Sequence, residues 1–556
     1  MDGLMMDFPL TLPVILDRAR TLFGGREVVS RLPDRSLQRA TYAEVAERAT
    51  RLAAALHELG IRPGDRVATL CWNHQQHLEA YLGIPLAGAV LHTLNLRLHP
   101  DDLAYIVDHA GDRAIIVDDV LLPLLAQFRE RVDVPHVIVV AHDSAVPPGT
   151  LDYEGLLAAA DVANFQEPSI DERQAAAMCY TSGTTGRPKG VVYPHRALVL
   201  HSLAVMTADV VGLSERDSVL PVVPMFHANA WGLPYASVLA GAKQVLPGPH
   251  LDPASLLELM QTERVTLAAG VPTIWLGLLQ FLEQHPGEYD LSSVARMPIG
   301  GQAVPESMIR AYRERHGIQI IQAWGMTETG PIATIGHLAA DLDGLDADEE
   351  YRYRSLQGRA AALIQVRIRG EEGILPWDGE AMGEVEVRGP WVASAYYENP
   401  ESAGQFTDDG WLRTGDIASI DRRGYVALKD RAKDVIKSGG EWISSIALEN
   451  ALMGHPAVAE AAVVAAAHPR WLERPVAVVV LKDGQVATEQ ELREHLAPRF
   501  ARWWLPDAVV FVDAIPRTST GKFLKAALRD EYRDLLTARA AAEQAVAGPA
   551  ADGSGA

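Results

Sequence analysis

The sequence predicts an α/β protein with two parts. A large N-terminal domain combines α/β layers with a small β subdomain, and a smaller α+β C-terminal domain follows. Short apolar, strand-like runs alternate with helical segments up to about residue 323, short strands with glycine turns begin near Leu363, and a further compact unit begins near Asp434. Such alternation is typical of layers around a mostly parallel sheet, which binds ligands at the carboxyl ends of its strands.

Bulk composition narrows the class of protein. The 556 residues exceed a single compact core, and 48% hydrophobic residues are too many for a disordered chain. A net charge of −22 argues against nucleic acid as a partner, because basic surfaces bind phosphate backbones. The two cysteines, Cys71 and Cys179, lie far apart, so neither a disulfide framework nor a cysteine metal site follows, and a reducing, cytoplasmic compartment fits.

The first residues do not look like a targeting segment. The opening "MDGLMMDFPL" carries an acid where a signal peptide needs a base, and prolines interrupt it. Uncharged apolar runs stay shorter than the roughly 18 residues that a membrane-spanning helix requires. We therefore expect no transmembrane segment.

One amphipathic helix is predicted over "TYAEVAERATRLAAALHELG". Thr41 and Glu44 form a capping box, and Gly60 ends the helix. One apolar face is formed by Val45, Ala49, Leu52, Leu56 and Leu59. The strand-like runs that follow are "RVATLC", "RAIIVDD", "HVIVVA", "SVLPVV", "TLAAG" and "IQIIQA".

The stretch "YTSGTTGRPKG", Tyr180 to Gly190, follows the strand-like "AAAMCY" and precedes a helix predicted from His195 onward. It is not a Walker A loop, because the second glycine of that motif would fall on Pro188. Its glycines allow consecutive N–H groups to face an anion, while its hydroxyls and Lys189 add donors and charge. Phosphate binding is one interpretation of this loop, and an ordinary polar surface turn is the other.

The second half of the chain has a different sequence pattern, with short strand-like runs separated by glycine turns. "LIQVRIRG", "GEVEVRG" and "IASIDRRGYVALKD" predict short antiparallel strands, and "SSIALENALMGH", "EAAVVAA" and "VAVVVLKDG" predict a helix and two strands of the last unit. "DLDGLDADEE", residues 341–350, is expected to be an acidic surface loop. The low-complexity tail, residues 539–556, is expected to be disordered.

The phosphate-type loop and four later motifs resemble those of the adenylate-forming superfamily of acyl-CoA synthetases, luciferases and peptide-synthetase adenylation domains. The later motifs are "WGMTET" (324–329), "TGD" (414–416), "KDRAKDVIKSGGEWIS" (429–444) and "PRTSTGKFLK" (516–525). The resemblance covers about residues 20–535 and is closest to medium- and long-chain fatty-acyl-CoA synthetases. It implies an N-terminal ATP- and acyl-binding domain (1–430, with a β-rich subdomain at about 357–430), a hinge (431–434) and a mobile C-terminal domain (435–538).

By this resemblance the protein activates a carboxylic acid with ATP, releasing pyrophosphate. Lys522 bridges the substrate carboxylate and the α-phosphate, Glu328 and Thr184 hold Mg²⁺, and Lys433 is the hinge residue. The ATP- and AMP-binding residues are expected to be Thr181, Ser182, Gly183, Thr184, Thr185, Gly186, Lys189, Gly301, Gln302, Trp324, Gly325, Thr327, Asp416 and Arg431. Surface roles are the alternatives: a solvated lysine at 522, a surface glutamate at 328, a turn aspartate at 416 and a salt-bridged arginine at 431.

Position 324 departs from the superfamily, which often has tyrosine there. Tryptophan keeps a flat surface for stacking on adenine and loses the phenol oxygen.

The acyl group is expected near "PMFHANAWGLPY". His227 and Trp231 on an apolar segment are ordinary core residues by composition alone. The resemblance places His227 near the adenylate carbonyl, as a third catalytic residue beside Lys522 and Glu328, and makes Trp231 a gate to the acyl tunnel. Gly300, in "IGGQAVP", flanks adenine and the acyl group, although a strand-end turn would use the same residues.

The acyl acceptor is expected to be CoA rather than a carrier protein, because no carrier domain follows. Its contacts by resemblance are Lys437, Ser438, Gly439, Gly440, Glu441 and Trp442. The resulting hypothesis is a fatty-acyl-CoA synthetase that uses ATP, Mg²⁺ and CoA. The alternatives are a ligase for a short or unusual acid such as methylthio-propionate, and a non-catalytic nucleotide-binding protein. A homodimer and weak peripheral membrane contact are further expectations.

Overall fold

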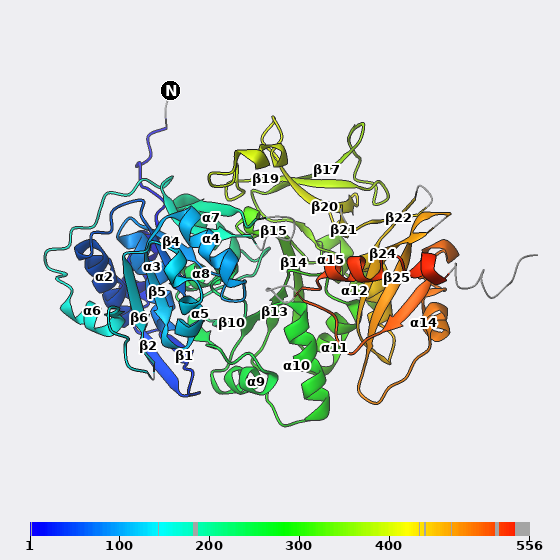
Figure 1. The fold of residues 1–556 in the computed structure, drawn as a ribbon, viewed down its shortest axis with the longest axis horizontal. Coiled ribbons are helices and arrows are strands. Elements are labelled where there is room, and N and C mark those ends of the chain that lie inside the picture. Colours follow the sequence, from blue (N-terminus) through cyan, green and yellow to red (C-terminus); the bar gives the residue numbers. More distant parts are fainter. Residues whose placement is uncertain are drawn as a thin grey trace, which may run out of the picture.

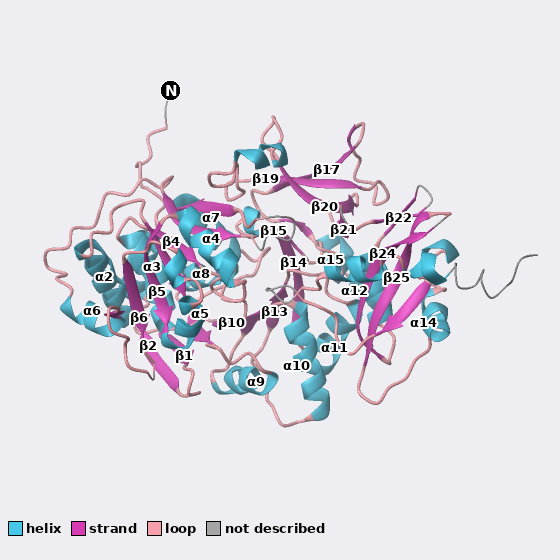
Figure 2. Cartoon of the chain, viewed as in Figure 1, coloured by secondary structure: helices cyan, strands magenta, loops and turns pink. Residues whose placement is uncertain are grey.

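The structure is a computed structural model that describes residues 1, 3–142, 144–181, 187–432, 434–438, 441–468, 470–517 and 522–539, with the backbone alone at 441 and 442. Four β-sheets organise it along one axis, from the N-terminal sheets at one end to the C-terminal unit at the other (Figure 1). Helices cover the two large sheets, as Figure 2 shows. The predicted α/β class is confirmed.

A seven-stranded sheet has the order β7-β6-β5-β3-β4-β8-β9, parallel except for its edge strand β9. Its strands are β3 (Arg66–Leu70), β4 (Val90–Thr93), β5 (Asp112–Asp118), β6 (His136–Val140), β7 (Leu151–Asp152), β8 (Ala175–Tyr180) and β9 (Gly190–Pro194). The helices of this region are α1 (Leu12–Leu22), α2 (Tyr42–Glu58), α3 (Gln75–Leu86), α4 (Pro100–Ala110), α5 (Leu122–Ala126) and α6 (Tyr153–Ala159). The predicted capping box of α2 is confirmed, because Thr41 and Glu44 bind each other's backbone N–H groups.

A nine-stranded sheet has the order β16-β15-β14-β13-β12-β10-β11-β1-β2. Its strands are β1 (Glu27–Arg31), β2 (Leu37–Thr41), β10 (Ser218–Pro221), β11 (Lys243–Leu246), β12 (Leu267–Ala269), β13 (Arg296–Ile299), β14 (Gln319–Gly325), β15 (Ile332–Ile335) and β16 (Arg359–Ala360). Its helices are α7 (His195–Met206), α8 (Leu233–Ala240), α9 (Pro253–Thr262), α10 (Pro272–Gln284), α11 (Glu306–His316) and α12 (Ala347–Arg354). The central strands run parallel, as the apolar runs predicted.

A five-stranded antiparallel sheet, ordered β18-β17-β19-β20-β21, lies beside the large sheets. Its strands are β17 (Gln365–Gly370), β18 (Gly373–Ile374), β19 (Gly383–Arg388), β20 (Leu412–Ile420) and β21 (Val426–Arg431). Buried apolar side chains of β17, β19 and β20 pack into the same core as α7 and α8. The small sheet is therefore fixed to the nine-stranded sheet.

The C-terminal unit is a mixed sheet with three helices. Its strands, ordered β23-β22-β25-β24 with β26 beside β25, are β22 (Ile436–Ser438), β23 (Glu441–Ile443), β24 (Val458–His468), β25 (Leu472–Leu481) and β26 (Ala508–Phe511). The helices are α13 (Ser445–Met453), α14 (Glu489–Leu496) and α15 (Lys525–Tyr532). Short 3₁₀ turns elsewhere include η1 (Asp119–Leu121), η2 (Arg129–Arg131), η5 (Ala340–Leu342), η6 (Pro400–Gln405) and η7 (Arg502–Trp504).

Polar contacts hold the C-terminal unit against the end of β21. Lys525 Nζ lies 2.7 Å from Glu449 Oε1 and also contacts Ser445 Oγ, while the backbone N–H of Ser445 donates to Asp430 Oδ2 at 3.0 Å. Burial raises the pKa of Glu449 to about 7, and the neighbouring Lys525 partly offsets this rise. Because Lys525 stands three residues after Lys522, this network also fixes the segment that carries Lys522.

Two local predictions need correction. A strand, β9, separates the phosphate-type loop from the helix that begins at His195, so β8 and β9 form a hairpin around the loop. The acidic stretch 341–350 is not simply a loop, because α12 begins within it. Asp346 caps that helix by accepting from the backbone N–H of Glu349 at 2.9 Å, and acids in a first helical turn are favourable.

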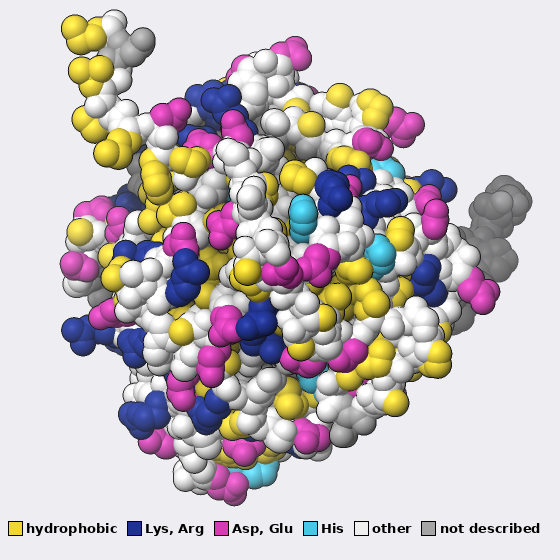
Figure 3. Space-filling model, turned by 90° about the vertical axis from the view of Figure 1, so that its left-hand side faces the viewer, with side chains coloured by type: hydrophobic (Ala, Val, Ile, Leu, Met, Phe, Trp, Pro, Cys, Tyr) yellow, Lys and Arg dark blue, Asp and Glu magenta, His cyan; other side chains and the backbone are white. Residues whose placement is uncertain are grey.

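The surface carries mixed charges, and exposed apolar side chains are scattered over it, including several on the N-terminal segment. Figure 3 shows lysine, arginine and acidic side chains interspersed on this face, with the N-terminal segment projecting from it. Leu4, Met5 and Met6 of that segment are almost fully exposed. Within the described residues, the helices include none with an apolar stretch sufficient to cross a bilayer.

Candidate active site

Two adjoining cavities lie where the nine-stranded sheet, the five-stranded sheet and the C-terminal unit meet. Their volumes are about 760 Å³ and about 310 Å³. Both are bordered by Gly301, Ala323, Trp324, Gly325, Arg431 and Lys522. Residues from both parts of the chain therefore line one continuous region.

A buried carboxylate organises the wall between the cavities. Asp416, in β20, faces Arg431, in β21, directly across the antiparallel ladder, and its Oδ1 lies 2.6 Å from Arg431 Nε. Its other oxygen accepts a hydrogen bond from the indole N–H of Trp324 at 2.9 Å. Trp324 thus supplies a donor that holds the carboxylate, which the sequence analysis did not foresee when it noted only the loss of a phenol oxygen.

A second acid lies at the other side of the large cavity. Glu328 belongs to the turn η4 (Thr327–Thr329), which follows β14, and its side chain is buried. The hydroxyl of Tyr396 donates to Glu328 Oε1 at 2.6 Å. Lys189 Nζ lies 4.8 Å from the centroid of the Tyr396 ring and 2.9 Å from Gln405 Oε1. Tyr396 therefore contacts the Lys189 ammonium with its ring and the Glu328 carboxylate with its hydroxyl.

Lys522 reaches this region from the C-terminal unit. It borders both cavities, and a Cβ placed on Gly301 would lie 3.5 Å from its Cε. Burial lowers the pKa of Lys522 to about 8, and Arg431 lowers it further, while Asp416 and Glu328 act in the opposite direction. The pKa of the Lys522 ammonium group therefore depends on Arg431 and on both acids, Asp416 and Glu328.

His227 lies on the same side as Lys522, at the start of a strained turn. Burial lowers the pKa of His227 to about 4, with smaller effects from Lys522 and Arg97, so the imidazole is neutral at pH 7. The next residues, from Ala228 to Trp231, all have positive φ between 43° and 58°. Left-handed residues other than glycine cost about 1–2 kcal/mol each, so this turn, η3 (Ala228–Gly232), stores strain beside the cavity.

Two glycines let this strained turn pack closely. A Cβ on Gly300 would lie 2.9 Å from the carbonyl oxygen of Ala323 and 3.4 Å from the Trp231 ring. A Cβ on Gly232 would lie 2.6 Å from Nδ1 of His201. Larger residues at these positions would displace the turn and the indole.

The large cavity also has an apolar part to its lining. The side chains of that part are Trp231, Val211, Val222, Val223, Phe226, Leu233, Leu251, Val271, Ile274, Ile332 and Ile335. Such a lining suits a hydrocarbon group and gives a charged group no partner.

The structure brings most of the predicted residues together. Bordering one or both cavities are Thr181, Lys189, His227, Trp231, Gly300, Gly301, Gln302, Trp324, Gly325, Thr327, Glu328, Asp416, Arg431 and Lys522. Outside the described residues lie Ser182, Gly183, Thr184, Thr185, Gly186, Lys433, Gly439 and Gly440.

Two of the residues predicted to contact CoA, Lys437 and Ser438, are described with their side chains and lie elsewhere. Of those described, Lys437 is exposed and Ser438 is buried, where its hydroxyl accepts from Arg474 at 3.2 Å, and neither borders the cavities. Glu441 and Trp442 belong to β23, but their side chains are not described. Their role as CoA contacts stays a prediction.

Among the cavity residues that the sequence analysis did not single out are Tyr396, Arg97 and Arg187, of which Arg187 lies 5.0 Å from the centroid of the Tyr105 ring. Tyr396 stands outside the quoted motifs, and its bond to Glu328 spans 68 residues. Arg187 lies inside "YTSGTTGRPKG", so its place in the motif was the available signal.

The fold and these cavities define a two-part α/β enzyme with its site at the junction of the parts. Comparison with family models gives a specific result: the model of the AMP-binding enzyme matches residues 16–397, and that of the AMP-binding enzyme C-terminal domain matches residues 447–522. The chain belongs to the AMP-binding enzyme family.

Curated relatives agree over nearly the full chain. A long-chain-fatty-acid–CoA ligase of Thermus thermophilus is 53% identical, with 95% of this chain and 97% of that one covered. A 3-methylmercaptopropionyl-CoA ligase of Ruegeria lacuscaerulensis is 45% identical (96% and 99% covered), and a medium-chain-fatty-acid–CoA ligase of Ectopseudomonas oleovorans is 43% identical (96% and 98%).

Solved structures share the whole fold. The anthranilate CoA ligase AuaEII in complex with anthranoyl-AMP superposes with a TM-score of 0.85 at 26% identity, covering 96% of this chain and 99% of that chain. ATP-bound MatB from Rhodopseudomonas palustris gives a TM-score of 0.80 at 27% identity, covering 95% and 100%.

Proposed function

We propose that the protein is an AMP-forming acyl-CoA ligase that acts on medium- to long-chain fatty acids. The observation that carries this proposal is that Lys522 borders both cavities, the larger with Arg431, Glu328 and an apolar lining, and the smaller with Asp416 and Arg431. The names of the similar ligases support the same reaction class.

In the first half-reaction a carboxylate oxygen bonds to the α-phosphorus of ATP, and the bond to the β-phosphate oxygen breaks. Pyrophosphate leaves with the electron pair, and an acyl adenylate forms. Both reactants are anions, so the site must offset their repulsion and hold them in line. Lys522 supplies that charge between them, worth of order 4 kcal/mol at about 4 Å and an effective dielectric near 20.

The remaining residues hold the nucleotide. Asp416 accepts from the ribose hydroxyls, Arg431 contacts ribose or phosphate oxygens, and the flat Trp324 ring stacks on adenine beside Gly301 and Gly325. The loop from Thr181 to Lys189, with Thr327, holds the β- and γ-phosphates. Gln302 and Gly300 flank the adenine and the acyl group.

The residues present fit a magnesium ion near Glu328. Tyr396 engages one carboxylate oxygen of Glu328, and the second, with substrate phosphate and water oxygens, makes a hard-donor set of the kind Mg²⁺ prefers. When bound, the ion neutralises phosphate charge. Thr184, the second proposed ligand, lies outside the described residues.

In the second half-reaction the thiol of CoA attacks the acyl carbonyl carbon, loses its proton to solvent, and AMP leaves. Of the proposed CoA contacts, Lys437 and Ser438 do not border the cavities, which is consistent with a C-terminal domain that turns about Lys433 between half-reactions. His227, neutral at pH 7, is placed to hydrogen-bond near the adenylate carbonyl, and Trp231 is placed to gate the acyl tunnel.

The test is AMP release over saturated acids from acetate to stearate, with and without CoA. An optimum at octanoate or longer supports the fatty-acid substrate. Activity confined to acids shorter than hexanoate contradicts it, and absence of AMP with every acid contradicts ligase activity itself.

A second candidate substrate is a short thioether acid. The 45% identity to a 3-methylmercaptopropionyl-CoA ligase over nearly the whole chain favours including it. A higher kcat/KM for 3-methylmercaptopropionate than for octanoate would make it the preferred one.

Association and location follow from the same proposal. Homodimerisation is expected by likeness to similar synthetases, and light scattering of the purified chain tests it. Weak peripheral membrane contact is tested by vesicle sedimentation. The two cysteines are free and buried, in keeping with the proposed cytoplasmic location.

A further inference from the structure

A second cluster of chemically active side chains lies away from the cavities, in the seven-stranded sheet. Cys71 directly follows β3, His74 caps α3, Asp118 ends β5, and His142 comes two residues after β6. Strands β6, β5 and β3 are parallel neighbours in the sheet. The cluster therefore occupies the carboxyl ends of adjacent parallel strands, where such sheets bind ligands.

Three of these residues converge on one point. The sulfur of Cys71, a ring nitrogen of His74 and a carboxylate oxygen of Asp118 all lie within 4.8 Å of one another, and all three residues are buried. Nε2 of His74 lies 2.7 Å from Oδ1 of Asp118.

His142 completes the group from a third loop. Its Nε2 lies 4.0 Å from Oδ1 of Asp118, and its ring stands nearly perpendicular to that of His74, with centroids 5.1 Å apart. Its side chain is only 5% exposed, yet its Nε2 has no hydrogen-bond partner among the described residues. Buried polar atoms are rarely left unpaired, so this nitrogen indicates a missing partner.

We propose that Cys71, His74, Asp118 and His142 bind a divalent transition-metal cation of the Zn²⁺ type. One thiolate, two imidazole nitrogens and one carboxylate oxygen form the kind of four-donor set that Zn²⁺ holds tetrahedrally. In such a site donor atoms stand roughly 3.3–3.8 Å apart. His74 Nε2 stands 2.7 Å from Asp118 Oδ1, and His142 Nε2 stands 4.0 Å from the same oxygen. His142 lies outside the group of three whose donor atoms are all within 4.8 Å of one another, so its side chain has to move inward to complete the set, and the Cys71 thiol releases its proton on binding.

Binding would give up three hydrogen bonds. Nδ1 of His74 accepts from the backbone N–H of His77 at 3.3 Å, Nε2 of His74 pairs with Asp118 Oδ1 at 2.7 Å, and the Cys71 thiol donates to the carbonyl oxygen of Ile116 at 3.5 Å. Presenting a bare Nε2 to the cation moves the proton to Nδ1, and a thiolate at Cys71 no longer donates. Four metal–ligand bonds would replace these three hydrogen bonds.

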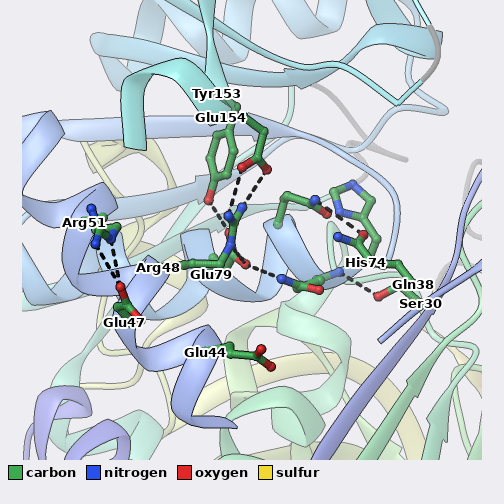
Figure 4. Close-up of polar contacts among 12 residues, drawn as sticks. Ser30, Gln38, Glu44, Glu47, Arg48, Arg51, His74, Glu79, Tyr153 and Glu154 are labelled. Carbon is green, nitrogen blue, oxygen red and sulfur yellow. Dashed lines mark hydrogen bonds and ion pairs between the residues drawn. The ribbon is translucent and has the colours of Figure 1, made fainter. Parts of the chain in front are cut away.

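The cluster rests on a rigid frame. Glu79 of α3 is buried and is bound by Arg48, Gln75 and Tyr153 at 2.7–2.8 Å, as Figure 4 shows beside His74. On the other side, Asp119 accepts from the backbone N–H of His142 at 2.9 Å. Preorganised ligands of this kind favour metal binding.

The cluster also connects to the wall of the large cavity. Asn73, between two of the proposed ligands, donates to the carbonyl oxygens of Pro221 and Val223 at 2.9 Å and accepts from the N–H of Met225 at 2.7 Å. The Trp72 ring lies edge-on to Phe226, which borders the cavity. A bound cation would therefore stiffen the segment that leads to His227 without touching substrate.

The test uses the full chain, stripped with a chelator and kept free of ATP, with excess Mg²⁺ to occupy the Glu328 region. Zn²⁺ is titrated against a chromophoric chelator, and Co²⁺ is added as a spectroscopic probe. We expect one tight Zn²⁺ per chain, a thiolate-to-cobalt charge-transfer band, tetrahedral d–d bands and a higher Tm. Absence of a stoichiometric Co²⁺ thiolate band in the wild-type chain overturns the proposal.

Variants assign the ligands. Cys71→Ser should abolish the charge-transfer band, and His142→Ala should weaken Zn²⁺ binding at least about ten-fold. The matched controls are Cys179→Ser and His285→Ala, each outside the cluster, which should leave the band and the affinity unchanged. If Cys71→Ser fails to fold, His142→Ala decides: unchanged Zn²⁺ affinity in that variant also overturns the proposal.

Discussion

The polar wall between the two cavities and the apolar lining of the large cavity, called the polar end and the apolar end below, are built in different ways. At the polar end, Asp416 accepts a hydrogen bond from Trp324 and pairs with Arg431 before any ligand is bound. At the apolar end, the wall is shaped by side-chain packing and by the left-handed turn from Ala228 to Trp231. Hydrogen bonds fix the positions of the charged groups at the polar end, whereas packing fixes the shape of the cavity at the apolar end. Substitutions that remove a charge should therefore lower activity most at the polar end, whereas substitutions that change side-chain size should alter substrate selectivity at the apolar end.

The largest effect is expected from Lys522→Ala. Removing the charge between two anions should lower the rate of adenylate formation by about three orders of magnitude, from a contact of about 4 kcal/mol. Pyrophosphate release in a single turnover measures it. Lys482→Ala, in a loop of the same C-terminal unit, is the control and should be near normal. Retention of more than a tenth of the wild-type rate in Lys522→Ala would refute the role.

A pH profile should sharpen the same contrast. With its pKa lowered to about 8, Lys522 is charged below that pH and loses its proton above it. We expect kcat/KM for ATP to fall about ten-fold per pH unit above the pKa of the free enzyme, and kcat to hold to higher pH because bound phosphates favour the ammonium. In Lys522→Arg the alkaline limb should disappear. A limb that persists unchanged in Lys522→Arg would assign it to another group.

At the apolar end, Trp231→Ala should alter selectivity rather than abolish activity. Removing the indole beside Gly300 should change the ratio of kcat/KM between octanoate and palmitate by about ten-fold, since contacts to about two methylene groups, at about 0.8 kcal/mol each, correspond to that ratio. Steady-state kinetics with both acids measure this ratio. An unchanged ratio together with unchanged ATP dependence of acid binding would exclude a gate.

The smallest effect is expected from Trp324→Phe. It keeps a flat ring and removes the N–H that binds Asp416, so KM for ATP should rise about five-fold, the value of one hydrogen bond of about 1 kcal/mol. Selectivity among acids should stay the same. A change in chain-length preference with no change in KM for ATP would contradict the separate roles assigned to the polar and apolar ends.

Local sequence patterns predicted the polar end better than the apolar end. Asp416 and Arg431 lie in short motifs, and their pairing follows from two neighbouring strands. Tyr396 was missed because its partner Glu328 is remote in sequence and only tertiary packing brings them together. The left-handed turn was missed because Ala228–Trp231 contains no glycine, the residue that normally signals positive φ.

The same reasoning explains the outcome for the elements. Apolar runs alternating with helical segments predicted the parallel strands correctly, and the spacing of Thr41 and Glu44 predicted the cap of α2 correctly. Strand β9 was missed because "GVVYP" is short and ends in proline, so its pairing with β8 decides its state. The number and spacing of the cysteines did not reveal the cluster at Cys71. Asp118 and His142 follow other strands and become neighbours of Cys71 and His74 only in the folded sheet.

The pairing of Asp416 with Arg431 bears on how well the acyl adenylate of the proposed mechanism is protected from hydrolysis. Both residues belong to the five-stranded sheet, whereas Lys522 enters from the C-terminal unit. In the proposed mechanism the C-terminal unit turns beyond Arg431, and the two residues proposed to hold the ribose would stay in place while Lys522 moves away. On that proposal, hydrolysis of the acyl adenylate would be limited by how tightly Asp416 and Arg431 hold the sugar rather than by how fast the C-terminal unit turns.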